Sequence, residues 1–240
     1  MHPLTKEIRT FLTEHADPER VRGAQRYFKE GFKGYGITQA RVQDFVNRTL
    51  RSLKSPLNLA EILIVAEELF RSRMYEEAVS AFILLEKYKK QFKGETLNLF
   101  SQWIDKYDEN WATNDSFCIK VVYHCFMNYP ELSPELTKWT MSQNRWMRRA
   151  ACVVLVKLVL KSDEFRTQGF QMAETLLDDR DEMVQKGVGW LLKELSRRDR
   201  KSVMDFLKEH YCQVPRLVLR YATERMNREQ RKRVLKGDFN

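Results

Sequence analysis

Apolar residues recur every three or four positions over most of the chain, which is the spacing of an amphipathic α-helix. No stretch alternates between apolar and polar residues for long enough to predict a strand. Glycines and prolines are few, nine and six in 240 residues, and they fall at breaks between the apolar segments. We therefore predict an all-α fold, with the clearest helical spacing in residues 59–72, 75–92, 118–129, 148–162, 169–179 and 188–199.

Two polar stretches mark the expected starts of helices. Ser133 precedes Pro134 and Glu135, and residues 178–183 (DDRDEM) place aspartates ahead of an acidic first turn. Side-chain oxygens of Ser and Asp accept hydrogen bonds from the free amides of a first helical turn, whose positive end also favours acidic residues. We expect a helix to begin at each place.

The predicted helices repeat along the chain. Ten-residue segments that begin at residues 78, 115, 149 and 186 align with one another, at steps of 37, 34 and 37 residues. A period of this length fits stacked helix pairs of the HEAT or armadillo kind, at the short end of their usual range. Equivalent positions of successive repeats line one face of such a stack, which is often concave and binds the ligand.

The first position of the last three aligned segments holds charged residues, namely Asp115, Arg149 and Lys186. Trp111 lies four residues before Asp115, and Trp190 lies four residues after Lys186, so each shares a helix face with its neighbour. One face of the stack is therefore predicted to hold two tryptophans, one carboxylate and several cations.

The charge of the chain favours a polyanionic partner. It carries 42 Lys and Arg against 33 Asp and Glu, a net charge of +9, and such an excess attracts nucleic acid through counterion release and electrostatic steering. The 43% hydrophobic content argues against disorder, and no segment approaches the roughly 20 apolar residues that cross a bilayer. The first 15 residues contain no long apolar run, so we do not expect a secretory signal.

Cysteine and histidine do not predict a metal site. None of the cysteines forms a C-x-x-C pair, and the four histidines are scattered. We expect reduced core cysteines in a cytoplasmic protein, without metal or other cofactor. The cysteines are Cys118, Cys125, Cys152 and Cys212.

The tryptophans divide into two groups. Trp103, Trp139 and Trp146 are expected in the core, because tryptophan is mostly buried. The turn that carries Trp111 (NWATNDS) has few apolar neighbours, so packing explains this side chain less well. An indole face beside the Asp115 carboxylate would stabilise a cation, such as an N-alkylated purine or the charge that develops on its deoxyribose during bond cleavage. A core tryptophan and a solvated or capping aspartate are the alternative interpretation.

Three motifs follow one another in the chain: W-x-x-x-D at Trp111 and Asp115, W-x-x-R-A-A at residues 146–151, and Q-K-x-x-G-W at residues 185–190. With these motifs and the stretch RYFKEGFKGYGI at residues 26–37, the chain resembles the AlkD family of alkylpurine DNA glycosylases over essentially its full length. Members of that family are bacterial repair enzymes built from HEAT-like repeats.

The resemblance implies a right-handed solenoid of about six HEAT-like antiparallel helix pairs, which form a concave, basic DNA-binding groove in a single domain spanning residues 1–240. It implies a monofunctional hydrolase that cuts the N-glycosidic bond of N3- and N7-alkylated purines in double-stranded DNA without base flipping. The products are the free base and an abasic site. A cationic purine leaves as a neutral base, so no general acid is needed. We expect a monomer in the bacterial cytoplasm, associated with the nucleoid and not with a membrane.

The resemblance also assigns roles to residues. Asp115 would be the catalytic carboxylate near the anomeric carbon, negatively charged at neutral pH as aspartates ordinarily are. Trp111 and Trp190 would pack against the deoxyribose, and Arg149 would hold the backbone phosphate. Further DNA contacts are expected from Arg148, Lys157, Lys186 and Lys193, and from the amino-terminal residues Tyr27, Thr38 and Arg41.

Two other functions stay open at the level of the sequence. One is a non-catalytic protein that binds DNA structures on the same helical scaffold. The other is a HEAT-repeat adaptor whose basic face meets an acidic protein partner.

Overall fold

The computed structural model describes residues 1–29 and 31–239, and every regular element within them is a helix. The all-α prediction is confirmed. Packing divides the chain into two compact units, which we call the N-terminal unit (residues 1–128) and the C-terminal unit (residues 129–240). Across the two described ranges, no helix is both long enough and apolar enough to span a bilayer.

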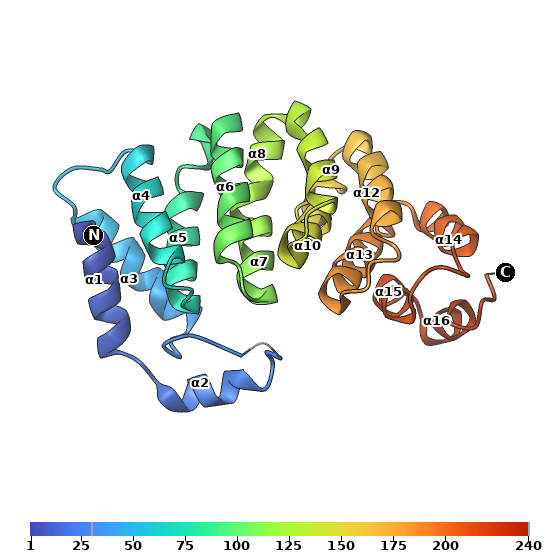
Figure 1. The fold of residues 1–240 in the computed structure, drawn as a ribbon, viewed down its shortest axis with the longest axis horizontal. Coiled ribbons are helices and arrows are strands. Elements are labelled where there is room, and N and C mark those ends of the chain that lie inside the picture. Colours follow the sequence, from blue (N-terminus) through green and yellow to red (C-terminus); the bar gives the residue numbers. More distant parts are fainter. Residues whose placement is uncertain (30, 240) are drawn as a thin grey trace. The chain divides into compact units, whose positions relative to one another are not determined.

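The N-terminal unit is built largely from neighbouring helices that pack against each other, α4 on α5 and α6 on α4 (Figure 1). In chain order the elements are α1 (Pro3–Glu14), α2 (Pro18–Gln25), α3 (Gln39–Ser52), α4 (Leu59–Phe70), α5 (Tyr75–Glu86), the 3-10 turn η1 (Lys89–Gln91), α6 (Gly94–Tyr107), α7 (Trp111–Phe117), the π-helical turn η2 (Cys118–Val122) and α8 (Tyr123–Asn128).

The centre of the N-terminal unit is α5, which contacts α1, α3, α4 and α7. Aromatic rings from α4, α5, α6 and α7 form one cluster, with neighbouring ring centroids 5.1–6.4 Å apart. Because aromatic side chains bury large areas and pack in defined orientations, this cluster fixes α7 against the helices before it. The rings belong to Phe70, Phe82, Phe100, Trp103 and Phe117.

In the C-terminal unit α13 contacts α10, α12 and α15. The close approach of α15 depends on Gly189, since a Cβ atom there would lie 2.5 Å from the Cβ of Tyr221. The elements are the 3-10 turn η3 (Pro130–Leu132), α9 (Pro134–Thr140), α10 (Arg145–Val153), α11 (Leu155–Leu158), α12 (Asp163–Thr175), α13 (Glu182–Leu195), α14 (Arg200–Glu209), α15 (Arg216–Ala222) and α16 (Arg228–Val234).

The aligned segments of the sequence repeat fall on equivalent helices. They lie on α5, on α7, η2 and the start of α8, on α10 and α11, and on α13. Of these helices, α5, α10 and α13 each pack against the helix that precedes them in the chain. The fourth aligned position is buried in each of the last three segments, at Cys118, Cys152 and Gly189. The repeat in the sequence therefore corresponds to a repeat of packing.

Both expected helix starts are observed, with different capping. Asp181 precedes α13 and accepts a hydrogen bond from the amide of Met183 at 2.8 Å. Ser133 precedes α9, but its side chain makes no capping hydrogen bond, and Pro134 occupies the first helical position. Proline has a helical φ and lacks an amide hydrogen, so the first turn of α9 has one fewer free amide that needs a hydrogen-bond acceptor.

The core residues expected from the sequence are mostly confirmed. Trp103, Trp139 and Trp146 are 3%, 4% and 4% exposed. Three of the free cysteines are buried, and burial raises the pKa of both Cys125 and Cys152 to about 12, so these groups stay thiols. The prediction for Cys212 is wrong, because it is exposed in the turn that follows α14.

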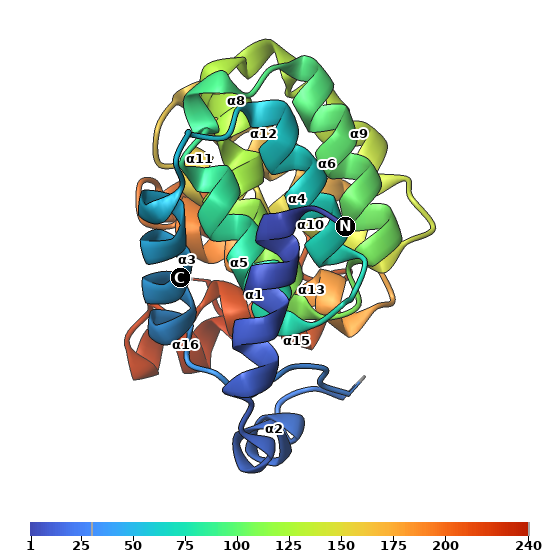
Figure 2. The same cartoon turned by 90° about the vertical axis from the view of Figure 1, so that its left-hand side faces the viewer.

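A segment that we call the N-terminal arm (residues 17–29 and 31–37) leaves the helix stack of its unit. Its helix α2 buries none of its residues and stands apart from α1 and α3 (Figures 1 and 2). The two ends of the arm meet where the Asp17 amide donates to the Tyr35 carbonyl at 2.7 Å. Gly36 has a φ of +79°, and a Cβ atom there would lie 2.2 Å from the Asp17 carbonyl oxygen. Only glycine fits this closure.

We expect Gly36→Ala to lower the free energy of unfolding by about 1–3 kcal/mol, because it adds both a left-handed strain and a clash with backbone. Gly23→Ala is the matched control in the same arm, since a Cβ there meets nothing within 4 Å. That change should raise helix stability by about 0.5–1 kcal/mol. Urea unfolding of both variants measures the difference, and equal midpoints would contradict the closure described.

Candidate active site

The helix α7 begins at Trp111 because Asn110 caps it. Asn110 has extended backbone angles, and its side-chain oxygen accepts from the amides of Ala112 and Thr113 at 3.0 and 3.1 Å. Capping by an Asn side chain fixes the first turn of a helix. Trp111 therefore occupies the first turn of α7, and Asp115 follows one turn later on the same face.

The two predicted residues on α7 differ in exposure. Asp115 is 9% exposed, whereas Trp111 is half-buried. The helix continues into η2, and single π-helical turns inside α-helices are frequent at functional sites. The structure thus places a nearly buried carboxylate and a partly accessible indole together on one short helix.

The N-terminal arm packs against Trp111. The Phe28 ring stacks on the indole, with centroids 5.3 Å apart and an interplanar angle of 13°. The indole N–H donates to the Tyr27 carbonyl at 3.4 Å. The orientation of Trp111 therefore depends on residues more than 80 positions earlier in the chain.

A second carboxylate lies close to Asp115. Asp108 ends α6 and accepts a hydrogen bond from the side-chain amide of Asn114 at 2.9 Å. Burial raises the pKa of Asp108 to about 7, against the effect of the hydrogen bonds from Asn114 and Thr113, and the negative charge of Asp115 raises it further. Near neutral pH Asp108 therefore holds a proton for much of the time.

In the C-terminal unit, Arg149 is 5% exposed on α10, and its guanidinium donates to the Met183 carbonyl. The side chain passes close to α13 at Gly187, where a Cβ atom would lie 3.4 Å from the Arg149 Cγ. A guanidinium has five N–H donors, so a fixed carbonyl partner sets the direction of the remaining ones.

The helix α13 carries Lys186 and Trp190 of the Q-K-x-x-G-W motif and, beyond the motif, Lys193. Trp190 is half-buried, as Trp111 is. Lys186 lies 4.0 Å from Glu182, and Lys193 pairs with Glu224 at 2.8 Å. The side chains of Lys186 and Lys193 are 23% and 20% exposed, so solvent reaches part of each lysine.

Four of the predicted DNA contacts lie on the surface. Tyr27 is 64% exposed beside the Arg26 guanidinium, and Thr38, Arg41 and Lys157 are exposed too. The Thr38 side chain also caps α3 by accepting from the Arg41 amide at 3.4 Å.

Arg148 makes contacts of a different kind. Its Nε donates to Asp179 at 2.6 Å, and Nη1 donates to the carbonyls of Ser142 and Gln143 at 2.9 and 3.0 Å. These bonds join the loop before α10 to the loop before α13. Within its own unit Arg148 thus holds the backbone, and a DNA contact by this residue stays a prediction.

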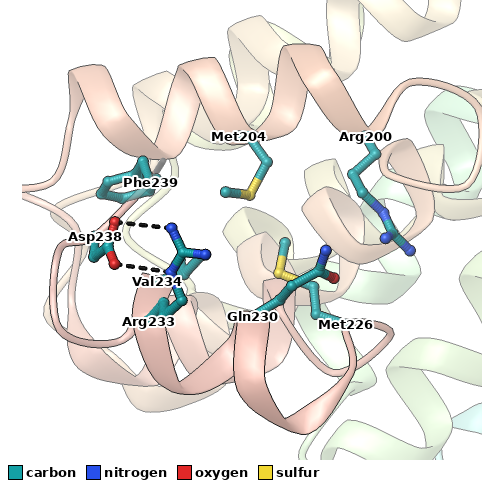
Figure 3. Close-up of a pocket in the computed structure, with 8 residues that line it drawn as sticks. All are labelled: Arg200, Met204, Met226, Gln230, Arg233, Val234, Asp238 and Phe239. Atoms are coloured by element: carbon teal, nitrogen blue, oxygen red, sulfur yellow. Dashed lines mark hydrogen bonds and ion pairs between the residues drawn. The ribbon is translucent and has the colours of Figure 1, made fainter.

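A cavity of about 210 Å³ lies at the end of the C-terminal unit (Figure 3). Met204 and Met226 face it, and the Arg233 guanidinium beside it is paired with Asp238 at 2.8 and 3.2 Å. None of the residues predicted to act on DNA is among those that line this cavity. Within residues 1–29 and 31–239, no group of three or more His, Cys, Asp or Glu side chains could hold a metal ion.

Sequence reasoning missed Phe28, Asp108 and Asn114. Phe28 lies in the stretch RYFKEGFKGYGI, but its contact with Trp111 gave no signal in the sequence because the two residues are more than 80 positions apart. Asp108 and Asn114 lie in the same DENWATNDSFC stretch as Trp111 and Asp115, so their spacing across the start of a helix could have been noticed.

Comparison with protein-family models identifies one family. The family model described as DNA alkylation repair enzyme matches residues 8–226. No curated relative matches the chain.

Three solved structures share the fold. A predicted DNA alkylation repair enzyme from Enterococcus faecalis is 17% identical, covering 89% of this chain and 98% of its own, with a TM-score of 0.78. AlkD2 from Streptococcus mutans is 19% identical over 88% and 99% of the two chains, with a TM-score of 0.61. The protein smu.31 from Streptococcus mutans UA159 is 21% identical over 83% and 95%, with a TM-score of 0.54. At such identities the likeness shows the fold alone, and it confirms the expected HEAT-like helical fold.

The raised pKa of Asp108 predicts a pH-dependent stability. Between its ordinary value of 3.8 and about 7, the folded state holds a proton that the unfolded chain releases. The contribution of this proton to the free energy of unfolding is therefore complete below pH 3.8 and is lost as the pH rises through 7, at about 1.4 kcal/mol per pH unit. Asp108→Asn cannot titrate, so its stability relative to the wild type should increase by about 2–3 kcal/mol between pH 5 and pH 7.

Urea unfolding of wild type and Asp108→Asn at pH 5, 6, 7 and 8 measures this difference. Asp44→Asn is the matched control, because Asp44 is exposed on α3, and its difference from wild type should stay nearly constant. Parallel curves for wild type and Asp108→Asn would show that Asp108 holds no proton in the folded state.

Proposed function

This chain belongs to the DNA alkylation repair enzyme family, and from that premise we propose that it is a monofunctional DNA glycosylase. Its substrates would be N3- and N7-alkylated purines in double-stranded DNA, and its products the free base and an abasic site. We further propose that it acts as a monomer, in the bacterial cytoplasm on the nucleoid, without a cofactor.

The observation that carries the proposal is the pairing of Asp115 and Trp111 on α7. Cleavage of the bond between the sugar and a cationic purine leaves positive charge on the deoxyribose. A carboxylate that is only 9% exposed acts on such charge more strongly than one in bulk water, because nearby solvent does not screen it. The adjacent indole face adds a further favourable interaction with a cation.

The proposed reaction requires few other catalytic groups. The electron pair of the glycosidic bond returns to the purine, which leaves as a neutral base, so no side chain has to protonate it. Water then forms the new bond to the anomeric carbon and releases a proton. We propose that Asp115 stabilises the charged sugar and orients this water, which are electrostatic and positioning roles.

The remaining predicted residues would bind the DNA backbone. We propose that Arg149 holds a phosphate, that Trp190 packs against deoxyribose, and that Lys186 and Lys193 exchange their carboxylate partners for phosphates. The 4.0 Å separation of Lys186 from Glu182 and the net charge of +9 support this assignment. Recognition through the backbone needs no pocket for the base, so we propose that the base is not flipped and that bulky adducts are accepted.

We expect Asp115→Asn to lower the rate of base release by at least about 100-fold, the usual effect of removing one electrostatic stabiliser from an active site. Binding to undamaged duplex should change less than about threefold, because the phosphate contacts are intact. The assay measures free 7-methylguanine and alkali-labile sites with duplex DNA that carries N7-methylguanine, under single-turnover conditions. Asp44→Asn on the exposed face of α3 is the control with the same chemical change.

Two results would contradict the proposal. Equal rates for wild type and Asp115→Asn would remove Asp115 from the mechanism. No base release by wild type that still binds duplex tightly would favour a non-catalytic DNA-binding protein instead.

A further inference from the structure

The base of the N-terminal arm is held by two buried carboxylates at the start of α5. Glu76 is 2% exposed and accepts hydrogen bonds from the amides of Tyr35, Gly36 and Ile37 at 2.7, 2.8 and 3.1 Å. Charged acceptors form stronger hydrogen bonds than neutral ones, and a buried carboxylate needs such partners. The chain therefore returns from the arm in one defined position.

Glu77 contacts two side chains at the base of the arm. It is 1% exposed, accepts from the Tyr35 hydroxyl at 2.9 Å and pairs with Arg9 at 2.8 Å. Burial and the neighbouring Glu77 charge raise the pKa of Tyr35 to about 12, so the hydroxyl stays a donor. Both contacts are polar, and both lie at the base of the arm.

A third polar contact lies next to α7. Lys33 of the arm pairs with Glu109 at 2.9 Å, and Arg73 pairs with the same carboxylate. Glu109 lies two residues before Trp111. The part of the arm that follows α2 is thus held by an ion pair to the chain just before α7.

Between these polar contacts, the arm presents aromatic rings to α7. Phe28 stacks on Trp111, and Phe32 lies 4.9 Å from Phe28 and 5.5 Å from Tyr75, measured between ring centroids. Since α2 buries none of its own residues, the arm adds little to the core of its unit. Its aromatic contacts gather on the indole that the proposed mechanism uses.

We propose that Phe28 is a positioning residue for the reaction, which sets the orientation of the Trp111 indole toward the DNA. This inference rests on the proposed function. The Phe28 ring covers one indole face, so a deoxyribose meets the other face or the edge. The hydrogen bond from the indole N–H to the Tyr27 carbonyl, at 3.4 Å, restrains the rotation of the ring about its Cβ–Cγ bond. An indole held in place before binding loses less entropy when it meets the sugar.

The test compares Phe28→Ala with Phe28→Tyr, which keeps a flat ring able to stack. At saturating protein, base release from N7-methylguanine DNA should slow by about 3- to 10-fold in Phe28→Ala, the range expected for loss of one aromatic pair. The dissociation constant for undamaged duplex should change less than about twofold, and Phe28→Tyr should restore the rate. Phe45→Ala is the control, because Phe45 stacks on Phe11 with centroids 3.8 Å apart, away from α7.

A double-mutant cycle separates positioning from general loss of stability. In a Trp111→Ala background the change Phe28→Ala should have no further effect on the rate, because Phe28 acts through the indole. Additive effects of the two changes would overturn the inference. So would an unchanged rate in Phe28→Ala when wild type is active.

A readout without catalysis distinguishes this inference from the proposed function. In protein labelled with 5-fluorotryptophan, the Trp111 fluorine resonance is identified by its absence in Trp111→Phe. Phe28→Ala should shift this resonance and Phe28→Tyr should return it close to its original position, whereas Phe45→Ala should leave it in place. A wild type that releases no base would contradict the proposed function. An unshifted Trp111 resonance in Phe28→Ala would contradict the inference about Phe28.

Discussion

A nearly buried carboxylate in a strongly basic chain is the constraint on which the candidate site depends. Asp115 is 9% exposed in a protein of net charge +9, and it lies one helical turn from an indole that solvent still reaches. Burying a charge is costly unless it has partners. The chain limits that cost nearby, because burial leaves Asp108 with a pKa of about 7 and so without a full second charge. Negative charge is thereby concentrated at one place on α7.

Contacts at both ends of α7 fix the positions of Trp111 and Asp115. The Asn110 cap fixes where the helix begins, and Phe117 at its other end packs in the aromatic core of the unit. Between them, Trp111 and Asp115 have little freedom to move apart. The N-terminal arm adds a second restraint from outside the helix stack, since Phe28 and the Tyr27 carbonyl both meet the indole. Local capping, core packing and a distant segment thus all restrain the same short helix.

Some of this was available from the sequence and some was not. The spacing of apolar residues predicted helices because a buried helix face needs that period, and the four-residue step from Trp111 to Asp115 predicted a shared face. The buried positions of Trp103, Trp139 and Trp146 followed from the ordinary behaviour of tryptophan. Cys212 was predicted in the core but is exposed, because composition does not distinguish a turn after a helix from the helix itself.

The arm could not be found in this way. Its contacts join residues 27 and 28 to residue 111, a separation of more than 80 positions, and no periodic pattern encodes such a pairing. The raised pKa of Asp108 depends likewise on how closely the end of α6 is packed. In both cases the missing information is tertiary, since it concerns which surfaces meet and how far water is excluded.

The central claim is that the protein is complementary to a positively charged deoxyribose. The most direct measurement compares binding of two duplexes that differ at one site, a cationic pyrrolidine in place of the sugar or the neutral tetrahydrofuran. At equal salt, wild type should bind the cationic analogue more tightly by about tenfold or more, as expected of a site complementary to a charged transition state, and Asp115→Asn should lose most of that preference. Equal affinity of wild type for the two duplexes, or a preference that survives the loss of the Asp115 charge, would contradict the account.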